Sequence, residues 1–328
     1  RDLRMSRGLG DVYKRQKIPL VYFERAVIMS QWDKDYLCLC RRILEEGTEV
    51  VNRTGTNTIK VPSHNFHFDL SKEFPILTTK QLFIRQAVLE MLWIYQAQSN
   101  DVRWLQERDV KIWNEWEIDD EGYWNASQML PDENGKLVKT PVHKFFGKEW
   151  AHTIGTAYGY IVNKFQMTQQ LIDKIKNHPE DRRMVMTLWQ NDYLDTAVLP
   201  SCVWSSEWDV TDGKLNCWVH QRSCDVPLGL PFNVTQYATL LCMLAQVCGL
   251  KPGTMDWSIK DAHIYVNQID GIKEQLKRFD EQGDLPAPKL WLNPEIDDFF
   301  KFDNSRDCND VKLIDYKHMG KIKFPISQ

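Results

Sequence analysis

The sequence predicts an α+β fold: a single domain with a large mixed β-sheet flanked by helices. Strand-like runs gather in a few stretches of the chain, and helix-like stretches stand apart from them. The composition fits one large core, because 43% of the 328 residues are hydrophobic and 13 are tryptophans. These three observations favour one large domain.

Helices are predicted where apolar residues recur at helical spacing. The first covers residues 33–47, where Asp33 opens the helix and Gly47 closes it. Residues 82–97 form a long and largely apolar stretch that we expect to be buried. The most helix-like stretch, 234–249, is rich in Leu, Met, Ala and Cys and ends at a glycine. Further helices are expected at residues 102–105, 166–177 and 270–278.

Strands are predicted where apolar and polar residues alternate. Residues 58–70 show this alternation over a long stretch. Further strands are expected at residues 184–189, 203–210 and 214–220, and within 310–324. The stretch 119–141 is polar and carries Gly, Asn, Pro and Asp, so we expect a surface loop or small insertion there.

The charge and the cysteine content exclude several classes of protein. The formal net charge of −4 argues against a general surface for nucleic acid or an anionic membrane. No apolar run approaches the ~18 residues that a membrane span needs. The eight cysteines include no CxxC pair, so we expect no metal site, no disulfide framework and a reduced, cytoplasmic protein. We expect residues 1–28 to be a non-native or disordered N-terminal extension, because their first part fits no pattern.

The most informative stretch is 221–233, which reads Gln-Arg-Ser-Cys-Asp-Val-Pro-Leu-Gly-Leu-Pro-Phe-Asn. Its Arg222 suits a phosphate, and the amide of Asn233 can both donate to and accept from a hydrogen-bonding ring. About twenty residues upstream, Cys202 lies in a Pro-Ser-Cys turn before a predicted strand. A cysteine there is either an inert core thiol or a nucleophile that needs a nearby cation such as Arg222. The two motifs together favour an enzyme that acts on a phosphorylated ring.

Glu90 is the second candidate for chemistry, because it sits inside an apolar helical stretch. Burying a carboxylate raises its pKa toward the range that a general acid or base requires. The alternative is an exposed position on an amphipathic helix.

These motifs, together with others along the chain, resemble those of the thymidylate synthase family, and most of all its Bacillus-type branch. The resemblance covers residues 29–328, which we take as one catalytic domain with 119–141 as a surface insertion. The motifs that carry it are Arg53–Thr56, Leu77–Lys80, Glu90–Trp93, Ile112–Trp116, Ala157–Gly159, Asp181–Arg183, Pro200–Cys202, Gln221–Asn233 and Asp261–Tyr265.

The resemblance implies reductive methylation of deoxyuridylate (dUMP) to thymidylate (dTMP). Methylenetetrahydrofolate would give both the one-carbon unit and the hydride and leave as dihydrofolate. Cys202 would attack carbon 6 of the uracil ring. A dUMP hydroxymethylase of the same family is the alternative, because the polar end Ser327–Gln328 departs from the usual apolar tail. A non-catalytic nucleotide- or RNA-binding relative is disfavoured, because Cys202, Glu90 and Asn233 are all present.

The resemblance also assigns roles to individual residues. Those expected in catalysis are Cys202, Glu90, Tyr158, Arg222 and Asn233. Those expected to bind the nucleotide are Arg53, Arg182, Arg183, Gln221, Arg222, Ser223, Cys224, Asp225, Asn233, His263 and Tyr265. Those expected to bind the folate are Lys80, Trp113, Asp225, Leu228, Gly229, Phe232, Ser327 and Gln328.

The family assembles as a homodimer packed sheet to sheet, and the resemblance implies that Arg182 and Arg183 reach across the interface. No nucleic acid is expected to be needed for catalysis. Four further residues also have ordinary alternatives, and one of them, His263, could be purely structural. Arg182 and Arg183 could be a solvated pair, and Asn233 could be the N-cap of the helix that follows it.

Overall fold

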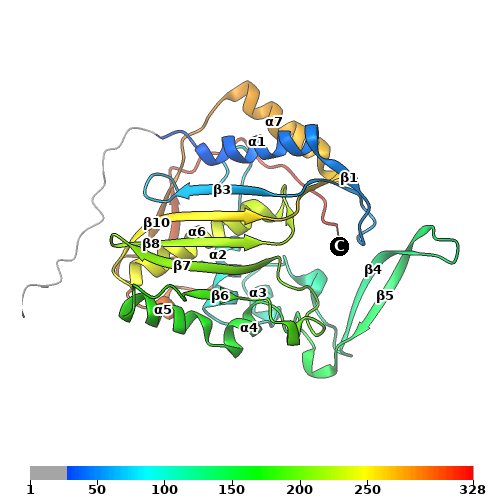
Figure 1. The fold of residues 1–328 in the computed structure, drawn as a ribbon, viewed down its shortest axis with the longest axis horizontal. Helices are drawn as coiled ribbons and strands as arrows, with labels where there is room; N and C mark the ends of the chain where they lie inside the picture. Colours follow the sequence, from blue (N-terminus) through cyan, green and yellow to red (C-terminus); the bar gives the residue numbers. More distant parts are fainter. Residues whose placement is uncertain (1–27, 328) are drawn as a thin grey trace, which may run out of the picture.

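The computed structural model describes residues 28–327, and its centre is a five-stranded mixed sheet in the order β3-β10-β8-β7-β6 (Figure 1). β10 runs parallel to β8, and the other neighbouring pairs are antiparallel. The prediction of a mixed sheet flanked by helices is therefore confirmed. The strands are β3 (His64–Asp69), β10 (Lys251–Ile259), β8 (Lys214–Gln221), β7 (Val203–Thr211) and β6 (Val185–Thr187).

Helices cover one face and two edges of this sheet. Figure 1 shows α2 (Ile84–Tyr95) and α6 (Gly229–Val247) behind it, where the two helices also pack on each other. The α1 (Gln31–Glu46) and α7 (Ile269–Gln282) helices lie above the sheet in the same view. Those below it are α3 (Arg103–Gln106), α4 (Gly159–Lys164) and α5 (Met167–Asn177). Short 3₁₀ helices cover Asn114–Trp116, Lys148–Trp150, Asn191–Tyr193, Val266–Gln268 and Phe299–Lys301.

A smaller four-stranded sheet brings distant segments together beside the main one. Its order is β1-β2-β11-β9, formed by β1 (Thr48–Val50), β2 (Thr58–Val61), β11 (Ala262–Tyr265) and β9 (Cys224–Asp225). In the parallel pair β11–β9, His263 stands opposite Asp225. Two motifs that are about forty residues apart in sequence therefore meet at one place.

The predicted surface loop at 119–141 is in fact part of a β-hairpin. β4 (Tyr123–Pro131) and β5 (Leu137–Phe145) pair in register from Tyr123–Phe145 to Pro131–Leu137. The hairpin projects from the body of the molecule near the C-terminal end (Figure 1). A second two-stranded ribbon pairs β12 (Lys289–Leu292) with β13 (Val311–Ile314), so only the first part of the predicted 310–324 stretch is a strand.

Three predicted boundaries also change. Ser30 caps α1 by accepting the N–H of Asp33 at 3.1 Å, so Asp33 lies inside the helix rather than opening it. The predicted strand 58–70 is divided into β2 and β3 at Pro62, which has no N–H to give to a ladder. The helix α6, which packs on the main sheet, begins at Gly229 and not at Val234.

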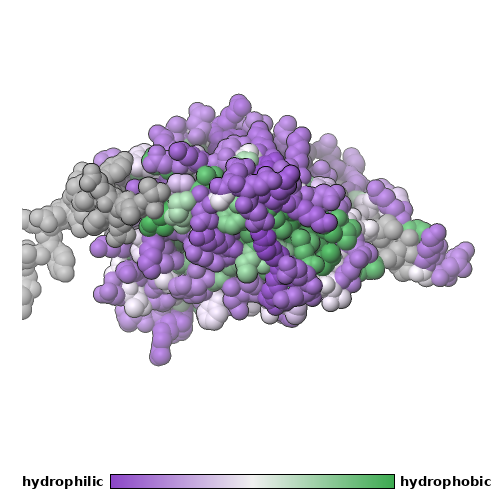
Figure 2. All heavy atoms as spheres, turned by 90° about the horizontal axis from the view of Figure 1, so that it is seen from above, coloured by the Kyte–Doolittle hydropathy of each residue, from purple (hydrophilic) through white to green (hydrophobic). Residues whose placement is uncertain are grey.

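Other expectations concern the surface and the ends of the chain. Seen from above in Figure 2, hydrophilic residues cover most of the surface around α1 and α7, with hydrophobic residues showing between them. Over residues 28–327, no helix has both the length and the apolar character needed to cross a membrane. All eight cysteines lie in this part of the chain, and none is in a disulfide. The hypothesis about residues 1–28 falls outside the described residues, apart from Ile28.

Candidate active site

Cys202 lies at the turn that precedes β7, half-buried and close to an arginine. The Nη2 atom of Arg222 is 3.8 Å from the Sγ atom of Cys202. The same guanidinium donates from Nε to the carbonyl of Ser201 at 3.1 Å and from Nη2 to the carbonyl of Pro200 at 2.7 Å. Burial raises the pKa of the Cys202 thiol, and the charge of Arg222 opposes that rise. The thiol therefore depends on this cation to become a thiolate.

Tyr158 holds the backbone of Cys202. Its hydroxyl accepts the N–H of Cys202 at 3.0 Å, and its ring meets the Trp113 ring edge-on with centroids 5.3 Å apart. Tyr158 adopts φ of 47°, a conformation that costs a non-glycine residue about 1–3 kcal/mol. The next residue must be glycine, because a Cβ on Gly159 would lie 1.9 Å from the carbonyl oxygen of Ser99. Burial raises the pKa of Tyr158 well above its ordinary value, so the phenol stays protonated at neutral pH.

Glu90 faces the same cluster from α2. Its Oε1 accepts the indole N–H of Trp113 at 2.8 Å, and its Oε2 accepts the side-chain N–H of Gln236 at 2.5 Å. Burial raises the pKa of Glu90 to about 7, against the effect of these two hydrogen bonds. The expectation of a carboxylate with a raised pKa is met, and a group that titrates near neutral pH can both take and give a proton.

A line of hydrogen bonds joins Glu90 to the main sheet through the amide of Asn233. The indole N–H of Trp257 donates to Gln221 Oε1 at 3.0 Å, and Gln221 Nε2 donates to Asn233 Oδ1 at 3.2 Å. Asn233 Nδ2 then donates to Gln236 Oε1 at 3.2 Å, and Gln236 completes the line at Glu90. The N-cap alternative for Asn233 is wrong, because Asn233 is the fifth residue of α6 and Leu228 stands at the cap position.

The nucleotide-binding candidates on β9 and β11 lie beside this cluster. His263 is buried, and its Nδ1 is 2.8 Å from Asp261 Oδ1. The rings of His263 and Tyr265 meet edge-on with centroids 5.2 Å apart. Arg53 is exposed on the loop between β1 and β2, and its positive charge favours the thiolate form of Cys202.

The C-terminal segment packs against the folate-binding candidates. Gln268 Nε2 donates to Asp225 Oδ2 at 3.1 Å and to the carbonyl of Pro325 at 3.1 Å, so one amide joins the site to the tail. Burial raises the pKa of Asp225. Lys80 is buried with its Nζ on the carbonyl of Pro227 and 4.6 Å from the centre of the Phe324 ring. Burial lowers the pKa of Lys80 to about 8.

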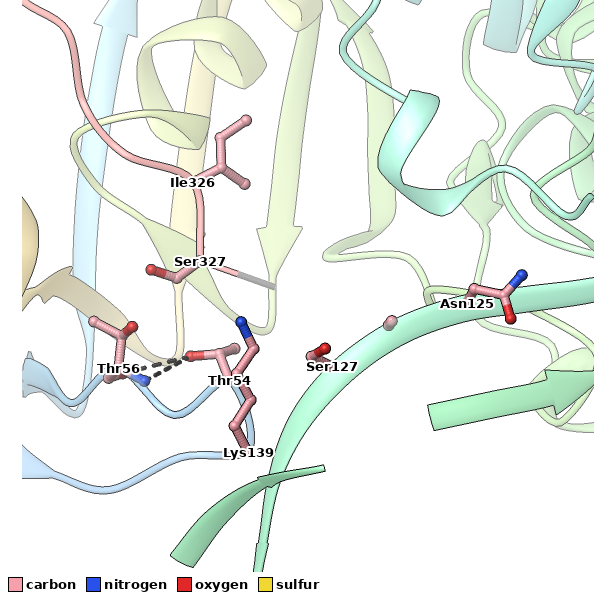
Figure 3. Close-up of a pocket in the computed structure, with 8 residues that line it drawn as sticks. Thr54, Thr56, Asn125, Ser127, Lys139, Ile326 and Ser327 are labelled. Atoms are coloured by element: carbon pink, nitrogen blue, oxygen red, sulfur yellow. Dashed lines mark hydrogen bonds between the residues drawn. The ribbon is translucent and has the colours of Figure 1, made fainter. Parts of the chain in front are cut away.

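A cleft of about 560 Å³ opens between three separate parts of the chain (Figure 3). The loop that carries Arg53 forms one wall, the end of the chain another and the β4–β5 hairpin the third. The lining residues are Thr54, Thr56, Asn125, Ala126, Ser127, Lys139, Ile326 and Ser327. The β4–β5 hairpin therefore borders this cleft beside the Arg53 loop.

Two predicted residues lie far from this cluster within the same chain. Arg182 and Arg183 are exposed and precede β6, and the N–H of Trp208 on β7 pairs with the carbonyl of Met184. Trp208 is six residues along β7 from Cys202, which is roughly 20 Å at ~3.3 Å per residue. The guanidinium of Arg183 pairs with its neighbour Asp181. The structure therefore does not bring either arginine to the Cys202 cluster within this chain.

Most of the remaining candidates lie between the end of β8 and the first turns of α6, and two lie at the end of the chain. Ser223 is half-buried, and the buried Cys224 uses its N–H on the carbonyl of Asp261 at 2.8 Å. The backbone N–H of Leu228 donates to Asp225 Oδ1 at 3.0 Å. Gly229 and Phe232 are half-buried in the first turns of α6. Ser327 borders the cleft, and Gln328 lies outside the described residues.

Sequence reasoning missed two residues of the hydrogen-bonded line, Gln236 and Trp257. Gln236 had a usable signal, because a glutamine within an otherwise apolar helical stretch needs buried hydrogen-bond partners. The strand of Trp257 also had a signal, because Met255, Trp257 and Ile259 alternate with polar residues, but the hydrogen bond from Trp257 to the distant Gln221 could not be predicted.

Comparisons with known proteins show what the chain is similar to. Residues 34–328 match the family model described as thymidylate synthase. The chain is 47% identical over 299 residues to the thymidylate synthase of Clostridium beijerinckii, which covers 91% of this chain and 100% of that protein. Among solved structures it is similar to the thermostable thymidylate synthase A from Bacillus subtilis, with a TM-score of 0.74 and 35% identity over 90% of this chain and 99% of that one.

Proposed function

We infer that this chain, which belongs to the thymidylate synthase family, converts deoxyuridylate to thymidylate at the cluster around Cys202. The observation that carries this assignment to a residue is the distance of 3.8 Å between Arg222 Nη2 and Cys202 Sγ. It gives a half-buried thiol the cation that it needs to act as a nucleophile.

The first step is attack of the Cys202 thiolate on carbon 6 of the uracil ring. A carbon–sulfur bond forms, and the electrons of the ring double bond move toward carbon 5 and the carbonyl at position 4. Asn233 meets the uracil edge, with its Oδ1 toward the ring N–H and its Nδ2 toward that carbonyl. Because charge develops on the carbonyl oxygen in this step, a fixed donor there lowers the barrier.

Proton transfers fall to Glu90 and Tyr158. The pKa of about 7 lets Glu90 exchange protons with the ring through water at neutral pH. Tyr158 keeps its phenol proton and fixes the Cys202 backbone, so in the step in which carbon 5 loses its proton we assign its hydroxyl to positioning the water that accepts that proton. The phosphate is placed by Arg53, Arg222 and Ser223, since guanidinium forks suit phosphate oxygens.

Methylenetetrahydrofolate supplies the one-carbon unit and the hydride when it is bound, and it leaves as dihydrofolate. The residues present fit such a ring, because the nearly buried Trp113 offers an aromatic face and Asp225 a carboxylate. Leu228, Gly229 and Phe232 would extend this wall. Lys80, Ser327 and Gln328 would act at the tail, where the Gln268 amide already joins Asp225 to Pro325. Closure of that segment would keep water from the reacting carbon.

Thymidylate formation can be tested together with the nucleophile. Wild type and Cys202→Ala are each supplied with deoxyuridylate and methylenetetrahydrofolate, while the absorbance of dihydrofolate is followed and the nucleotide is weighed by mass spectrometry. We expect dihydrofolate and thymidylate in equal amounts from wild type and neither from the variant. A hydroxymethylated nucleotide without dihydrofolate would refute methylation, and activity in Cys202→Ala would refute the assigned nucleophile.

We also propose a homodimer in which Arg182 and Arg183 bind the phosphate in the partner's site. Two observations support it. The face of the main sheet opposite α2 and α6 leaves Trp204 and Trp218 exposed by 37% and 49%. The two arginines stand roughly 20 Å from their own Cys202 along β7, as estimated above from strand geometry. An exposed aromatic sheet face of this kind is typical of an interface with another copy.

Mixing two inactive variants tests the shared site. Cys202→Ala and the double variant Arg182→Ala/Arg183→Ala are unfolded together, refolded and assayed. Random pairing restores one intact site in each mixed dimer, so about a quarter of wild-type activity should return. Activity no higher than the sum of the separate variants would refute sharing. Each variant refolded alone provides the control.

A further inference from the structure

The hydrogen-bonded line through Asn233 has a fixed direction. An indole N–H can only donate, so the atom of Gln221 that faces Trp257 is the oxygen, and its nitrogen faces Asn233. Asn233 must then turn Oδ1 to Gln221 and Nδ2 to the oxygen of Gln236. The nitrogen of Gln236 is left for the carboxylate of Glu90. The indole of Trp257, which can only donate, thus fixes which end of each amide in the line is the oxygen and which is the nitrogen.

Gln236 links Asn233, the residue proposed to recognise uracil, to Glu90, the residue proposed to transfer protons. It is only 5% exposed and lies three residues after Asn233 on α6, which places the two side chains next to each other on one face of the helix. Its Oε1 accepts a hydrogen bond from Asn233 Nδ2, and its Nε2 donates a hydrogen bond to Glu90 Oε2. Among residues 28–327, no other side chain forms hydrogen bonds with both Asn233 and Glu90.

We propose that Gln236 is a positioning residue that fixes the Asn233 amide for uracil and stabilises the carboxylate form of Glu90 relative to the carboxylic acid. This inference rests on the proposed function, because it concerns the same ring and the same proton transfers. Gln236 itself does not have to touch the substrate, so we do not count it as catalytic.

The orientation of Asn233 for uracil follows from the hydrogen-bonding capacity that its amide has left. Once Oδ1 has accepted from Gln221 and Nδ2 has donated to Gln236, Oδ1 can still accept once and Nδ2 can still donate once. Uracil presents a ring N–H and a carbonyl, which match these two atoms. Cytosine presents a ring acceptor and an amino donor, so it would require the amide to flip. Flipping would break both bonds to Gln221 and Gln236.

The second half follows from the direction of the bonds to Glu90. Both of its oxygens accept from donors, one from Trp113 and one from Gln236, which favours the carboxylate over the carboxylic acid. Tyr158 is the titratable neighbour whose pKa responds to the charge of Glu90. Burial acts against both donors and leaves the pKa of Glu90 near 7. Removing one donor should therefore move this titration upward.

Two substitutions separate the halves. Gln236→Met keeps the length of the side chain and removes both hydrogen bonds. We expect the acidic limb of the pH–activity profile to rise by about one pH unit, as loss of one bond to a charged group implies. We expect the preference for deoxyuridylate over deoxycytidylate in binding to fall roughly ten-fold. Gln236→Glu keeps an acceptor for Asn233 but sets a second carboxylate against Glu90, so the preference should persist while the acidic limb rises further.

Gln246→Met is the matched control, because Gln246 lies on the same helix and donates to two backbone carbonyls away from the site. It should lose stability but move neither the pH profile nor the nucleotide preference. Two measurements need no turnover. Calorimetry gives the binding of both nucleotides, and the infrared carbonyl stretch of protonated Glu90, identified with Glu90→Gln, gives its titration. An inactive wild type would therefore overturn the proposed function alone. This inference would be overturned if Gln236→Met showed an unshifted Glu90 titration and an unchanged nucleotide preference. If Gln236→Met does not fold, an unshifted Glu90 titration in Gln236→Glu would overturn it.

Discussion

Replacing Arg222 with glutamine should slow the reaction of Cys202 with iodoacetamide at neutral pH. The guanidinium and the sulfur are 3.8 Å apart, and at an effective dielectric of ~20 a full charge pair at that distance gains roughly 4 kcal/mol. A free-energy change of about 1.4 kcal/mol shifts a pKa by one unit, so this attraction can lower the pKa of Cys202 by at most about three units. Cys202 is half-buried, and water screens part of the attraction.

We therefore expect the pKa of Cys202 to rise by about one to two units in Arg222→Gln. The cation favours the thiolate, so its loss lowers the thiolate fraction at neutral pH by roughly ten- to a hundred-fold. The two proteins should react alike only above the pKa of the variant. Peptide-resolved mass spectrometry measures the alkylation of each cysteine as pH varies, and the exposed Cys38 serves as the internal reference. Identical profiles for Cys202 in both proteins would refute the reasoning.

Three further predictions concern the tail, the tyrosine and the buried lysine. Gly271→Ala would place a Cβ 2.5 Å from the Phe324 ring, so carboxypeptidase should remove the tail faster and the KM for folate should rise, whereas unchanged digestion would count against the docking. Tyr158→Phe removes the acceptor of the Cys202 N–H, and urea unfolding should show a loss of about 1–3 kcal/mol, while an unaltered midpoint would contradict it. Burial lowers the pKa of Lys80 to about 8, so the unfolded chain binds the extra proton between that pH and ~10.4, and stability should rise across this window. Lys80→Met should abolish that rise, and a persisting rise would assign it to another group.

The elements with strong local periodicity were predictable, and those set by distant partners were not. The predicted helix 166–177 and the strands at 203–210 and 214–220 match α5, β7 and β8 within a residue or two. β10 was missed although Met255, Trp257 and Ile259 alternate with polar residues; its position in the sheet, and that of β11, depend on pairing with β8 and β2. Local alternation carries no information about such partners.

Two errors have identifiable physical causes. The start of α6 was placed too late because Pro231 reads as a helix breaker, yet in the first turn of a helix its missing N–H has no partner to lose. The β4–β5 hairpin was taken for a loop although Asn134-Gly135 at its tip is a turn signal typical of hairpins.

The candidate site was only partly readable from the sequence. The Cys202–Arg222 pair could be anticipated because the Pro-Ser-Cys turn suits a nucleophile and a nucleophilic thiol needs a nearby cation. The Gln236 contact with Glu90 could not, because it joins α6 to α2 across 146 positions of the chain. Distances of that kind are set by the packing of the two helices behind the sheet.

The central claim is that Cys202 attacks the uracil ring and that carbon 5 then loses its proton. Deoxyuridylate carrying tritium at carbon 5 tests both steps at once. We expect wild type, supplied with methylenetetrahydrofolate, to release tritium into water in equal amount with thymidylate formed, and Cys202→Ala to release none. Thymidylate formed by wild type without matching tritium release, or tritium release by Cys202→Ala, would contradict the account.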